Sequence, residues 1–285
     1  MKKLLFLFDT DAQPSVFDTV VAYDGGADRV TGYGNVTPET VGALVDGTVF
    51  TRGGKDKQNT AIFVGGGNMG KGEALFEKIK KHFFGPFRVS VMLDSNGSNT
   101  TAAAGVAQLA KGRSLKGKKA VVLAGTGPVG MRAAGFLGME GADVTITSRT
   151  KERAEDAAKV IGKRFGIEVK GVAGGTDEER TEAVKDANIV YAAGAIGVQL
   201  LPKAAWENNP NIELLADVNA QPPLGVEGIE ATDKGKDYNG KLAFGALGIG
   251  GLKLKLHRAC IGKMFESSDG VFDAEEIYAL AKEMA

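Results

Sequence analysis

Residue types that build metal centres and disulfides are almost missing from this sequence. It contains one cysteine, Cys260, and two histidines, His82 and His257, among 285 residues. A single cysteine excludes an internal disulfide, so nothing in the chain requires an oxidising compartment. The two histidines have no ligand partners at zinc spacing. We therefore predict no metal site, and we expect Cys260 to be an ordinary core residue.

Charge of one sign and long apolar runs are also missing. The 35 basic residues balance 35 acidic ones, which removes the basic field expected of a nucleic-acid-binding protein. No stretch approaches the roughly 18 apolar residues that mark a membrane-spanning helix. The apolar run after Lys3 ends at Asp9, before it reaches the length of the apolar region of a signal peptide. The sequence predicts a soluble, cytoplasmic protein that binds neither nucleic acid nor membrane.

Glycine, in contrast, is abundant, with 41 residues against 8 prolines. That share is about twice the average of roughly 7%, yet there is no Gly-X-Y period that would indicate collagen. Apolar residues at 43% and charged residues at 25% are typical of a globular protein. The glycines therefore indicate tight turns and close backbone approaches, such as a bound nucleotide or a flat ring system requires.

Apolar runs of strand length alternate with helical patterns along nearly the whole chain, which predicts an α/β fold with parallel sheets covered on both faces. The expected strands are Lys3–Phe8, Thr48–Thr51, Ala61–Val64, Arg88–Leu93, Lys119–Ala124, Asp143–Thr147, Glu168–Val172, Ile189–Ala192 and Ile212–Ala216. The expected helices are Ser15–Tyr23, one starting at Thr37–Thr40, Met69–Phe83, Thr100–Lys111, Val129–Met139, Lys151–Phe165, Asp177–Asp186, Leu252–Phe265 and Asp273–Ala285.

Two stretches, Lys111–Lys118 and Gly245–Gly251, divide these elements into two domains. Residues 113–251 are predicted to form a Rossmann-type doubly wound parallel sheet that binds a dinucleotide. Residues 1–112 and 252–285 are predicted to form an α/β N-terminal domain that the C-terminal helices complete. We expect small ligands to bind in the crevice between such domains.

The predicted strand Lys119–Ala124 runs directly into Gly125-Thr126-Gly127-Pro128-Val129-Gly130 and then into a helix. This is the Gly-x-Gly-x-x-Gly pattern in the context that a dinucleotide site requires. The first glycine permits the turn, the second admits the pyrophosphate, and the third packs the helix against the strand. The helix N-terminus then supplies amide donors to the phosphates. A glycine turn that only packs is the alternative.

The next strand indicates which dinucleotide fits. A site for NAD places Asp or Glu at the end of this strand to bind the ribose hydroxyls. Here Asp143–Thr147 runs into Ser148-Arg149-Thr150-Lys151 instead. Arg149 offers a planar cation to a 2′-phosphate, and Lys151 adds a second positive charge. The pattern favours NADP over NAD; a solvated basic turn is the alternative.

A second glycine run, Gly65–Gly70, also lies between a strand and a helix. With Lys71 it nearly matches a phosphate-binding P-loop, but Gly72 replaces the hydroxyl residue that would hold magnesium, so we do not expect nucleoside triphosphate chemistry. The run is interpreted as a helix N-terminus at the cleft or as a tight turn.

Residues for nucleophilic or acid–base catalysis are scarce. There is no Gly-x-Ser-x-Gly motif. Tyr278 and Lys282 have the Tyr-x-x-x-Lys spacing of some reductases, but they lie in the last predicted helix, and we interpret them as a surface pair. The chemistry should therefore depend on positioning more than on proton transfer.

Eight segments, spread over nearly the whole chain, carry a resemblance to a known family. They are Phe8–Asp11, Pro14–Asp18, Tyr23–Asp28, Gly32–Pro38, Met92–Gly105, Gly125–Gly130, Asn219–Pro223 and Phe244–Arg258. Together they resemble the NADP-dependent methylene-tetrahydromethanopterin dehydrogenases of methylotrophic bacteria, which also accept methylene-tetrahydrofolate. The resemblance runs essentially from end to end. A sister family uses NAD or NADP, and Arg149 favours the strictly NADP-dependent family.

The resemblance implies an oxidoreductase of one-carbon metabolism. It would move a hydride from the methylene carbon of the tetrahydromethanopterin or tetrahydrofolate derivative to NADP, leaving the methenyl form and NADPH. The two nitrogens beside that carbon stabilise the resulting cation, so positioning is enough for catalysis. Related bifunctional folate enzymes use a Tyr-x-x-x-Lys pair for cyclohydrolysis, and because none is suitably placed here we predict no cyclohydrolase activity. The family also implies a homo-oligomer, a trimer or a multiple of it.

Site residues are assigned from these patterns. For the substrate residues the alternatives are N-capping by Ser98 or Asn99, a capped loop at Asp9 and Asp11, and a solvated helix face at Lys253, Lys255 and His257. The residues assigned to the pterin substrate are Asp9, Asp11, Phe17, Asp18, Asn96, Thr100, Thr101, Lys253, Lys255 and His257. The residues assigned to NADP are Gly125, Thr126, Gly127, Pro128, Val129, Gly130, Ser148, Arg149, Thr150, Lys151, Ala193, Gly194, Ala195, Ile196 and Asn219.

Two other functions compete with this one. Another Rossmann oxidoreductase, similar to shikimate dehydrogenase, would need a Lys–Asp pair that we do not find. A dinucleotide sensor without catalytic activity would share the glycine turn and show no turnover.

Overall fold

A computed structural model describes residues 1–285, and in it the chain divides into two compact units. The first unit contains residues 1–100 and 254–280, and the second contains residues 101–253 and 281–285. The chain passes from one unit to the other within α4 (Ser98–Ala110), within α9 (Ala246–Lys263) and within the last helix, α10 (Ala274–Met284). The functional domains expected at 1–112 with 252–285 and at 113–251 stay a prediction.

The first unit contains a parallel five-stranded sheet in the order β12-β4-β3-β1-β2. This is a doubly wound order, because the chain leaves β1 for β2 on one side and then crosses back to β3 on the other. The carboxyl ends of β1 and β3 therefore form the switch point, where Asp9 pairs with Gly65. The strands are β1 (Leu4–Asp9), β2 (Arg29–Tyr33), β3 (Thr60–Gly65), β4 (Ser90–Leu93) and β12 (Val271–Phe272).

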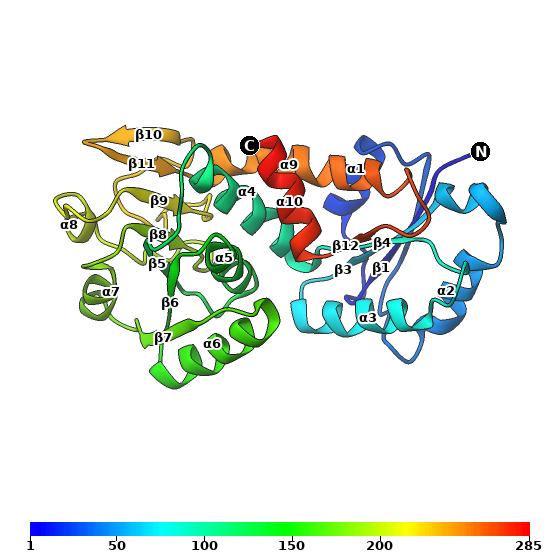
Figure 1. Ribbon diagram of the computed structural model, residues 1–285, viewed down its shortest axis with the longest axis horizontal. Coiled ribbons are helices and arrows are strands. Elements are labelled where there is room, and N and C mark those ends of the chain that lie inside the picture. The colour runs from blue at the N-terminus through cyan, green and yellow to red at the C-terminus, as the bar shows by residue number, and fades with distance from the viewer. The chain divides into compact units, whose positions relative to one another are not determined.

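Helices cover both faces of this sheet (Figure 1). On one face, α2 (Val41–Val49) and α3 (Met69–His82) bury a core that includes Val45, Ile62 and Leu75. On the other face, α1 (Val16–Asp24) and the second half of α9 pack closely, since a side chain at Gly25 would meet Ile261 at 2.6 Å. The unit also contains short 3-10 helices and most of a final helix. These are η1 (Gly54–Asn59), η2 (Ser95–Gly97) and α10 (Ala274–Met284).

The second unit contains a seven-stranded sheet in the order β10-β11-β9-β8-β5-β6-β7. All neighbours are parallel except the β10–β11 hairpin. Counted from β5, six of its strands have the 3-2-1-4-5-6 order of a Rossmann sheet, so the predicted fold class is confirmed. The strands are β5 (Lys119–Leu123), β6 (Asp143–Ser148), β7 (Val169–Ala173), β8 (Ile189–Ala192), β9 (Leu214–Asp217), β10 (Lys234–Tyr238) and β11 (Lys241–Phe244).

The helices of this unit also lie on opposite faces of its sheet. α5 (Pro128–Met139) and α6 (Lys151–Phe165) contact each other, as the right-handed crossovers from β5 to β6 and from β6 to β7 require. α7 (Asp177–Val184) and α8 (Lys203–Trp206) contribute to a core with Val121, Leu123 and Leu215. None of the helices is long and apolar enough to cross a membrane.

The structure corrects several expected elements. Thr48–Thr51 is not a strand: Val41, Val45 and Val49 are buried along one face of α2, and this spacing is helical. The helix expected from Thr37 begins only at Val41, with Thr40 at its N-cap. The glycine-rich stretch Gly245–Gly251 is helical from Ala246 onward and is no linker.

Candidate functional site

The glycine turn of the second unit lies at the switch point of its sheet, between β5 and β8. Gly127 is the N-cap of α5 and Pro128 is its first residue. A side chain at Gly130 would meet the Gly125 Cα at 2.8 Å, so this glycine brings helix and turn together. A side chain at Gly127 would have no neighbour closer than 3.9 Å. The neighbours of Gly127 therefore do not require a glycine at this position.

These observations fit a dinucleotide. The open space at Gly127 and the N-terminus of α5 suit a pyrophosphate, whose charge the helix N-terminus favours. Thr126, Pro128 and Val129 are partly exposed around this space, whereas Gly125 and Gly130 are buried. The turn thus presents backbone to a ligand on one side and packs against the fold on the other.

The residues assigned to the 2′-phosphate follow β6 directly. Ser148 is buried, whereas the side chains of Arg149, Thr150 and Lys151 are exposed at the start of α6. Thr150 caps this helix by accepting a hydrogen bond from the Arg153 amide at 3.4 Å. No Asp or Glu stands at the end of β6, and the exposed Arg149 is the first charged residue after this strand. The arrangement suits a phosphate better than a pair of ribose hydroxyls.

The ends of β8 and β9 carry the other assigned residues. Ala193 and Gly194 are half-buried behind β8, and Ile196 is 67% exposed. Asn219 was predicted to bind the cofactor, but it is buried, and both polar atoms of its side chain form hydrogen bonds within the protein. Its Oδ1 accepts from the Gln221 amide and its Nδ2 donates to the Pro223 carbonyl, each at 3.1 Å. Asn219 therefore shapes the turn that follows β9.

Asp217, at the end of β9, is a residue that sequence reasoning missed. Its buried carboxylate accepts hydrogen bonds from the amides of Asn219 and Val226, both at 2.9 Å. Burial raises the pKa of this carboxyl, while the backbone hydrogen bonds act to lower it. An acid at the end of an apolar strand was the available signal. Asp217 anchors the loop that contains Asn219.

In the first unit, three segments meet at the switch point of the sheet. Asp11, after β1, accepts from the Gly67 amide at 2.7 Å, and Asn96, after β4, donates to the Gly67 carbonyl at 3.0 Å. Both side chains are exposed. Asp9 is only 1% exposed and accepts from the amides of Asp11 and Ser15, and burial raises its pKa. The structure thus brings Asp11 and Asn96 together and leaves Asp9 beneath them as a support.

A second group of assigned residues is completely buried. Thr100 donates to the Asp94 carboxylate at 2.6 Å, and the His257 Nδ1 lies 3.9 Å from the same carboxylate. The His257 ring stacks on Phe63 at a centroid distance of 5.4 Å. Phe17 is 50% exposed, and the centroid of its ring lies 6.3 Å from that of the His257 ring. Thr100 and His257 therefore lie in the interior of this unit and are not exposed as the assignment to the substrate required.

The remaining assigned residues do not form a group. Asp18 is half-buried in the first turn of α1, where its amide donates to Ser15. Lys255 is exposed on α9, whereas Lys253 is buried on the same helix. Thr101 is half-buried in α4.

The structure corrects one further expectation: Tyr278 is a core residue, not half of a surface pair. Cys260 is buried as predicted.

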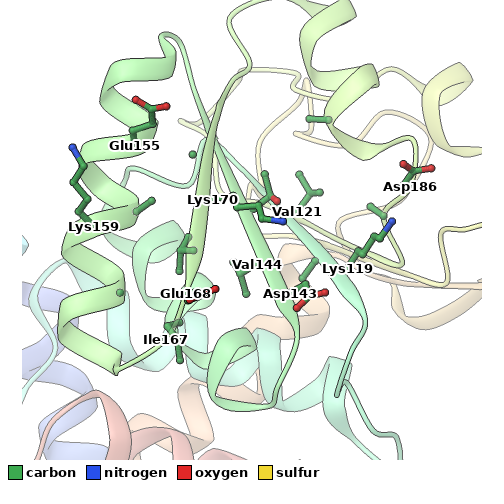
Figure 2. Close-up of a pocket in the computed structure, with 18 of the residues that line it drawn as sticks. Lys119, Val121, Asp143, Val144, Glu155, Lys159, Ile167, Glu168, Lys170 and Asp186 are labelled. Carbon is green, nitrogen blue, oxygen red and sulfur yellow. The ribbon is translucent and has the colours of Figure 1, made fainter.

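One groove in the second unit has a volume of about 880 Å³ and contains none of the assigned residues. Figure 2 shows charged side chains from α6 (Glu155, Lys159), from the amino ends of β5 and β6 (Lys119, Asp143), from the start of β7 (Glu168, Lys170) and from the segment after α7 (Asp186). Ligands of doubly wound sheets bind at the carboxyl ends of the strands. Its charges are of both signs, so we assign it no ligand. The structure also contains no cluster of metal-binding side chains.

Comparison with known proteins adds independent evidence. A family profile described as "Methylene-tetrahydromethanopterin dehydrogenase, N-terminal" matches residues 16–96. The "Bifunctional protein MdtA" of Methylorubrum extorquens is 70% identical over 286 aligned positions, which cover 100% of this chain and 99% of that protein. The "NAD(P)-dependent methylenetetrahydromethanopterin dehydrogenase" of the same organism is 34% identical and covers 95% of each chain.

Among solved structures, a shikimate 5-dehydrogenase from Listeria monocytogenes in complex with shikimate and NAD is similar with a TM-score of 0.54. The match covers 98% of this chain and 96% of that one at 13% sequence identity. At this level the similarity concerns the fold alone.

Proposed function

The chain belongs to the methylene-tetrahydromethanopterin dehydrogenase family, and from that premise we propose that it oxidises a methylene-pterin with NADP. The substrate is methylene-tetrahydromethanopterin, with methylene-tetrahydrofolate as a second carrier. The products are the methenyl-pterin and NADPH. The observation that carries the choice of NADP over NAD is the exposed Arg149 directly after β6, and the open turn at Gly127 supports a dinucleotide of either kind.

Residues of the second unit would hold the cofactor. The Gly125–Gly130 turn and the first amides of α5 bind the pyrophosphate, and Arg149 with Lys151 binds the 2′-phosphate. Ala193, Gly194, Ala195 and Ile196 border the remaining length of the dinucleotide. When bound, NADP supplies the ring that accepts the hydride. Asn219 contributes by shaping its loop, since its side chain already has two backbone partners.

Residues of the first unit would hold the pterin. The exposed carboxylate of Asp11 and the exposed amide of Asn96 suit the amino and amide groups of a pterin ring. Phe17 offers a flat apolar surface, and Lys255 offers a cation to the acidic tail of the carrier. Asp9, Thr100 and His257 are buried beneath this surface, so we assign them support of the exposed residues.

We also propose that no side chain acts as general acid or base. The two ring nitrogens beside the methylene carbon share the positive charge of the product, so hydride departure needs no proton transfer. Orientation alone can contribute about 7–11 kcal/mol to such a reaction. We also expect no cyclohydrolase activity, for a different reason: of the Tyr-x-x-x-Lys pair, Tyr278 is buried in the core, and the ammonium of Lys282 pairs with Glu140 at 2.9 Å.

The decisive experiment is an absorbance assay for NADPH formation with each methylene-pterin and with NADP or NAD. We expect turnover with NADP and both carriers, and much weaker turnover with NAD. A dinucleotide sensor would bind NADP without turnover, and an enzyme of the shikimate dehydrogenase type would ignore both pterins. Decay of the methenyl absorbance after addition of enzyme would reveal a cyclohydrolase.

The trimeric assembly and the cytoplasmic location remain predictions. Light scattering on the purified protein tests the assembly.

A further inference from the structure

The glycine turn is held from the side by one residue of the neighbouring strand. Thr147 is buried near the end of β6, and its Oγ1 accepts a hydrogen bond from the Ala124 amide at 3.1 Å. Its backbone carbonyl accepts a second hydrogen bond from the Gly125 amide at 2.9 Å. Two successive amides of the turn are thus satisfied by a single residue that does not belong to the turn.

Ala124 is the residue that needs this support. Its φ angle is +53°, in the left-handed region that side chains with a Cβ avoid. Such a conformation persists only where its surroundings hold it, and it is commonly found at ligand sites. Ala124 directly precedes Gly125-Thr126-Gly127. Its conformation therefore sets the direction in which the phosphate-binding turn leaves β5.

Thr147 also adjoins the segment assigned to the 2′-phosphate. Ser148 and Arg149 follow it in sequence, and the Ser148 carbonyl accepts from the Gly174 amide at 2.8 Å. A side chain at Gly174 would meet the Thr147 Cβ at 2.7 Å, so the threonine is packed on that side. Thr147 thus has little freedom to move, and it lies between the two segments that the cofactor would touch.

We propose that Thr147 is a positioning residue for NADP: its hydroxyl holds Ala124 in the left-handed conformation and so aims the glycine turn at the pyrophosphate. This inference rests on the proposed function of the turn. It assigns Thr147 no contact with the cofactor. It also implies that Ala124 and Thr147 act as a pair, whose substitutions have effects that do not add.

The test is fluorescence titration with NADPH, combined with KM values for both substrates. Thr147→Val keeps the shape but leaves the Ala124 amide without its acceptor, so NADPH should bind about tenfold more weakly, in keeping with the usual cost of a lost hydrogen-bond partner. KM for NADP should rise while KM for the methylene-pterin stays the same. Thr147→Ser, which retains the oxygen, should bind NADPH like the parent protein.

Thr145→Val is the matched control, because Thr145 lies two residues earlier on β6, with its side chain on the same face, and makes none of these hydrogen bonds. It should bind NADPH like the parent protein. In the Ala124→Gly background the turn no longer needs the hydroxyl, so Thr147→Val should weaken binding by only about threefold. This background also allows the comparison if Thr147→Val alone does not fold.

The outcomes separate the possibilities. Unchanged NADPH affinity in Thr147→Val, with or without a lower melting temperature, overturns the positioning role. An equal loss in Thr145→Val also overturns it, since the effect would then belong to the strand in general. Failure of the parent protein to bind NADPH overturns the proposed function itself, which is a different result from any difference among the variants.

Discussion

The backbone amide of Asn219 donates a hydrogen bond of 2.9 Å to the buried carboxylate of Asp217 at the end of β9. The Val226 amide donates to the other oxygen of the same carboxylate, also at 2.9 Å. One side chain therefore ties together both ends of the loop 218–226. The loop borders the carboxyl end of the Rossmann sheet, where a dinucleotide would lie.

Asp217→Asn should destabilise the second unit. Asparagine would replace one of the two accepting oxygens with an NH₂ group, so that two donors would face each other. An unsatisfied buried donor costs about 1–3 kcal/mol. We expect the free energy of unfolding in urea to fall by that amount. Asp186→Asn, at an exposed aspartate, is the control and should leave it unchanged. Equal stability of Asp217→Asn and the parent protein would contradict the anchoring role.

The same pair of proteins should differ in pH dependence. Burial raises the pKa of Asp217 above its ordinary 3.8, so the folded state keeps this proton to a higher pH than the unfolded state. Ionisation of Asp217 therefore opposes folding. The free energy of unfolding of the parent protein should fall as pH rises from 3.8 to the raised pKa of Asp217. Asparagine does not titrate. The stability gap between the two proteins should therefore narrow as pH rises through this window.

Much of the fold could be predicted from sequence because its signals are local. The buried strands Ile189–Ala192 and Lys119–Leu123 are short apolar runs, and the turn at Gly125 has a pattern tied to one geometry. β2 was missed because Arg29–Tyr33 is an edge strand that is mostly exposed and has no apolar run. The β10–β11 hairpin was missed although Asn239-Gly240, both with positive φ, is a recognised hairpin turn.

The supports of the site were harder to predict than its surface. Arg149 and Asp11 could be predicted as exposed residues because each follows a strand, and the end of a strand can be recognised from the sequence. Whether Asn219 and His257 face a ligand or the core depends on packing between segments distant in sequence. The roles of Thr147 and Asp217 depend on hydrogen bonds to other strands and loops. An acid at the end of an apolar strand singles out Asp217 but not its partners, and the sequence contains no such signal for Thr147.

Arg149→Ala should weaken NADPH binding and leave NADH binding nearly unchanged, because only the 2′-phosphate loses its partner. The loss of a hydrogen bond to a charged group costs roughly 1.5–3 kcal/mol, or about one to two decades in affinity. Titration of both cofactors measures the difference. Arg153→Ala, an exposed arginine one turn further into α6, should affect neither. Equal weakening of both cofactors would show that Arg149 does not read the 2′-phosphate.

Gly127→Val should lose NADPH binding, whereas Gly130→Ala should lose stability. The Cβ at position 127 enters open space, so the valine variant should keep its melting temperature but lose NADPH binding, since the side chain fills the place of the pyrophosphate. The Cβ at position 130 would lie 2.8 Å from the backbone of Gly125, so the alanine variant should unfold at a lower temperature. If Gly127→Val binds NADPH normally, the phosphates bind elsewhere, and Gly65–Gly70 is the next candidate.

Hydride transfer should proceed without a general acid or base, and this can be tested at four side chains: Asp9, Asp11, Asp18 and Lys255. The carboxylate of Asp9 is buried and occupied by two backbone amides, and that of Asp11 is held by the Gly67 amide. Replacement of each residue by an uncharged analogue should therefore raise KM or misalign the pterin, with no change in how the rate depends on pH.

A true general acid or base contributes typically 10²–10⁴-fold and imposes its pKa on the pH–rate profile. We expect the single-turnover rate of hydride transfer to be nearly flat between about pH 6 and 8, where histidine and perturbed groups titrate. His257, one of only two histidines, is completely buried. Deuterium at the methylene carbon should slow this step equally at every pH. A sigmoidal profile that disappears when one of the four side chains is neutralised would show that a proton moves in the rate-limiting step, and catalysis by positioning alone would be wrong.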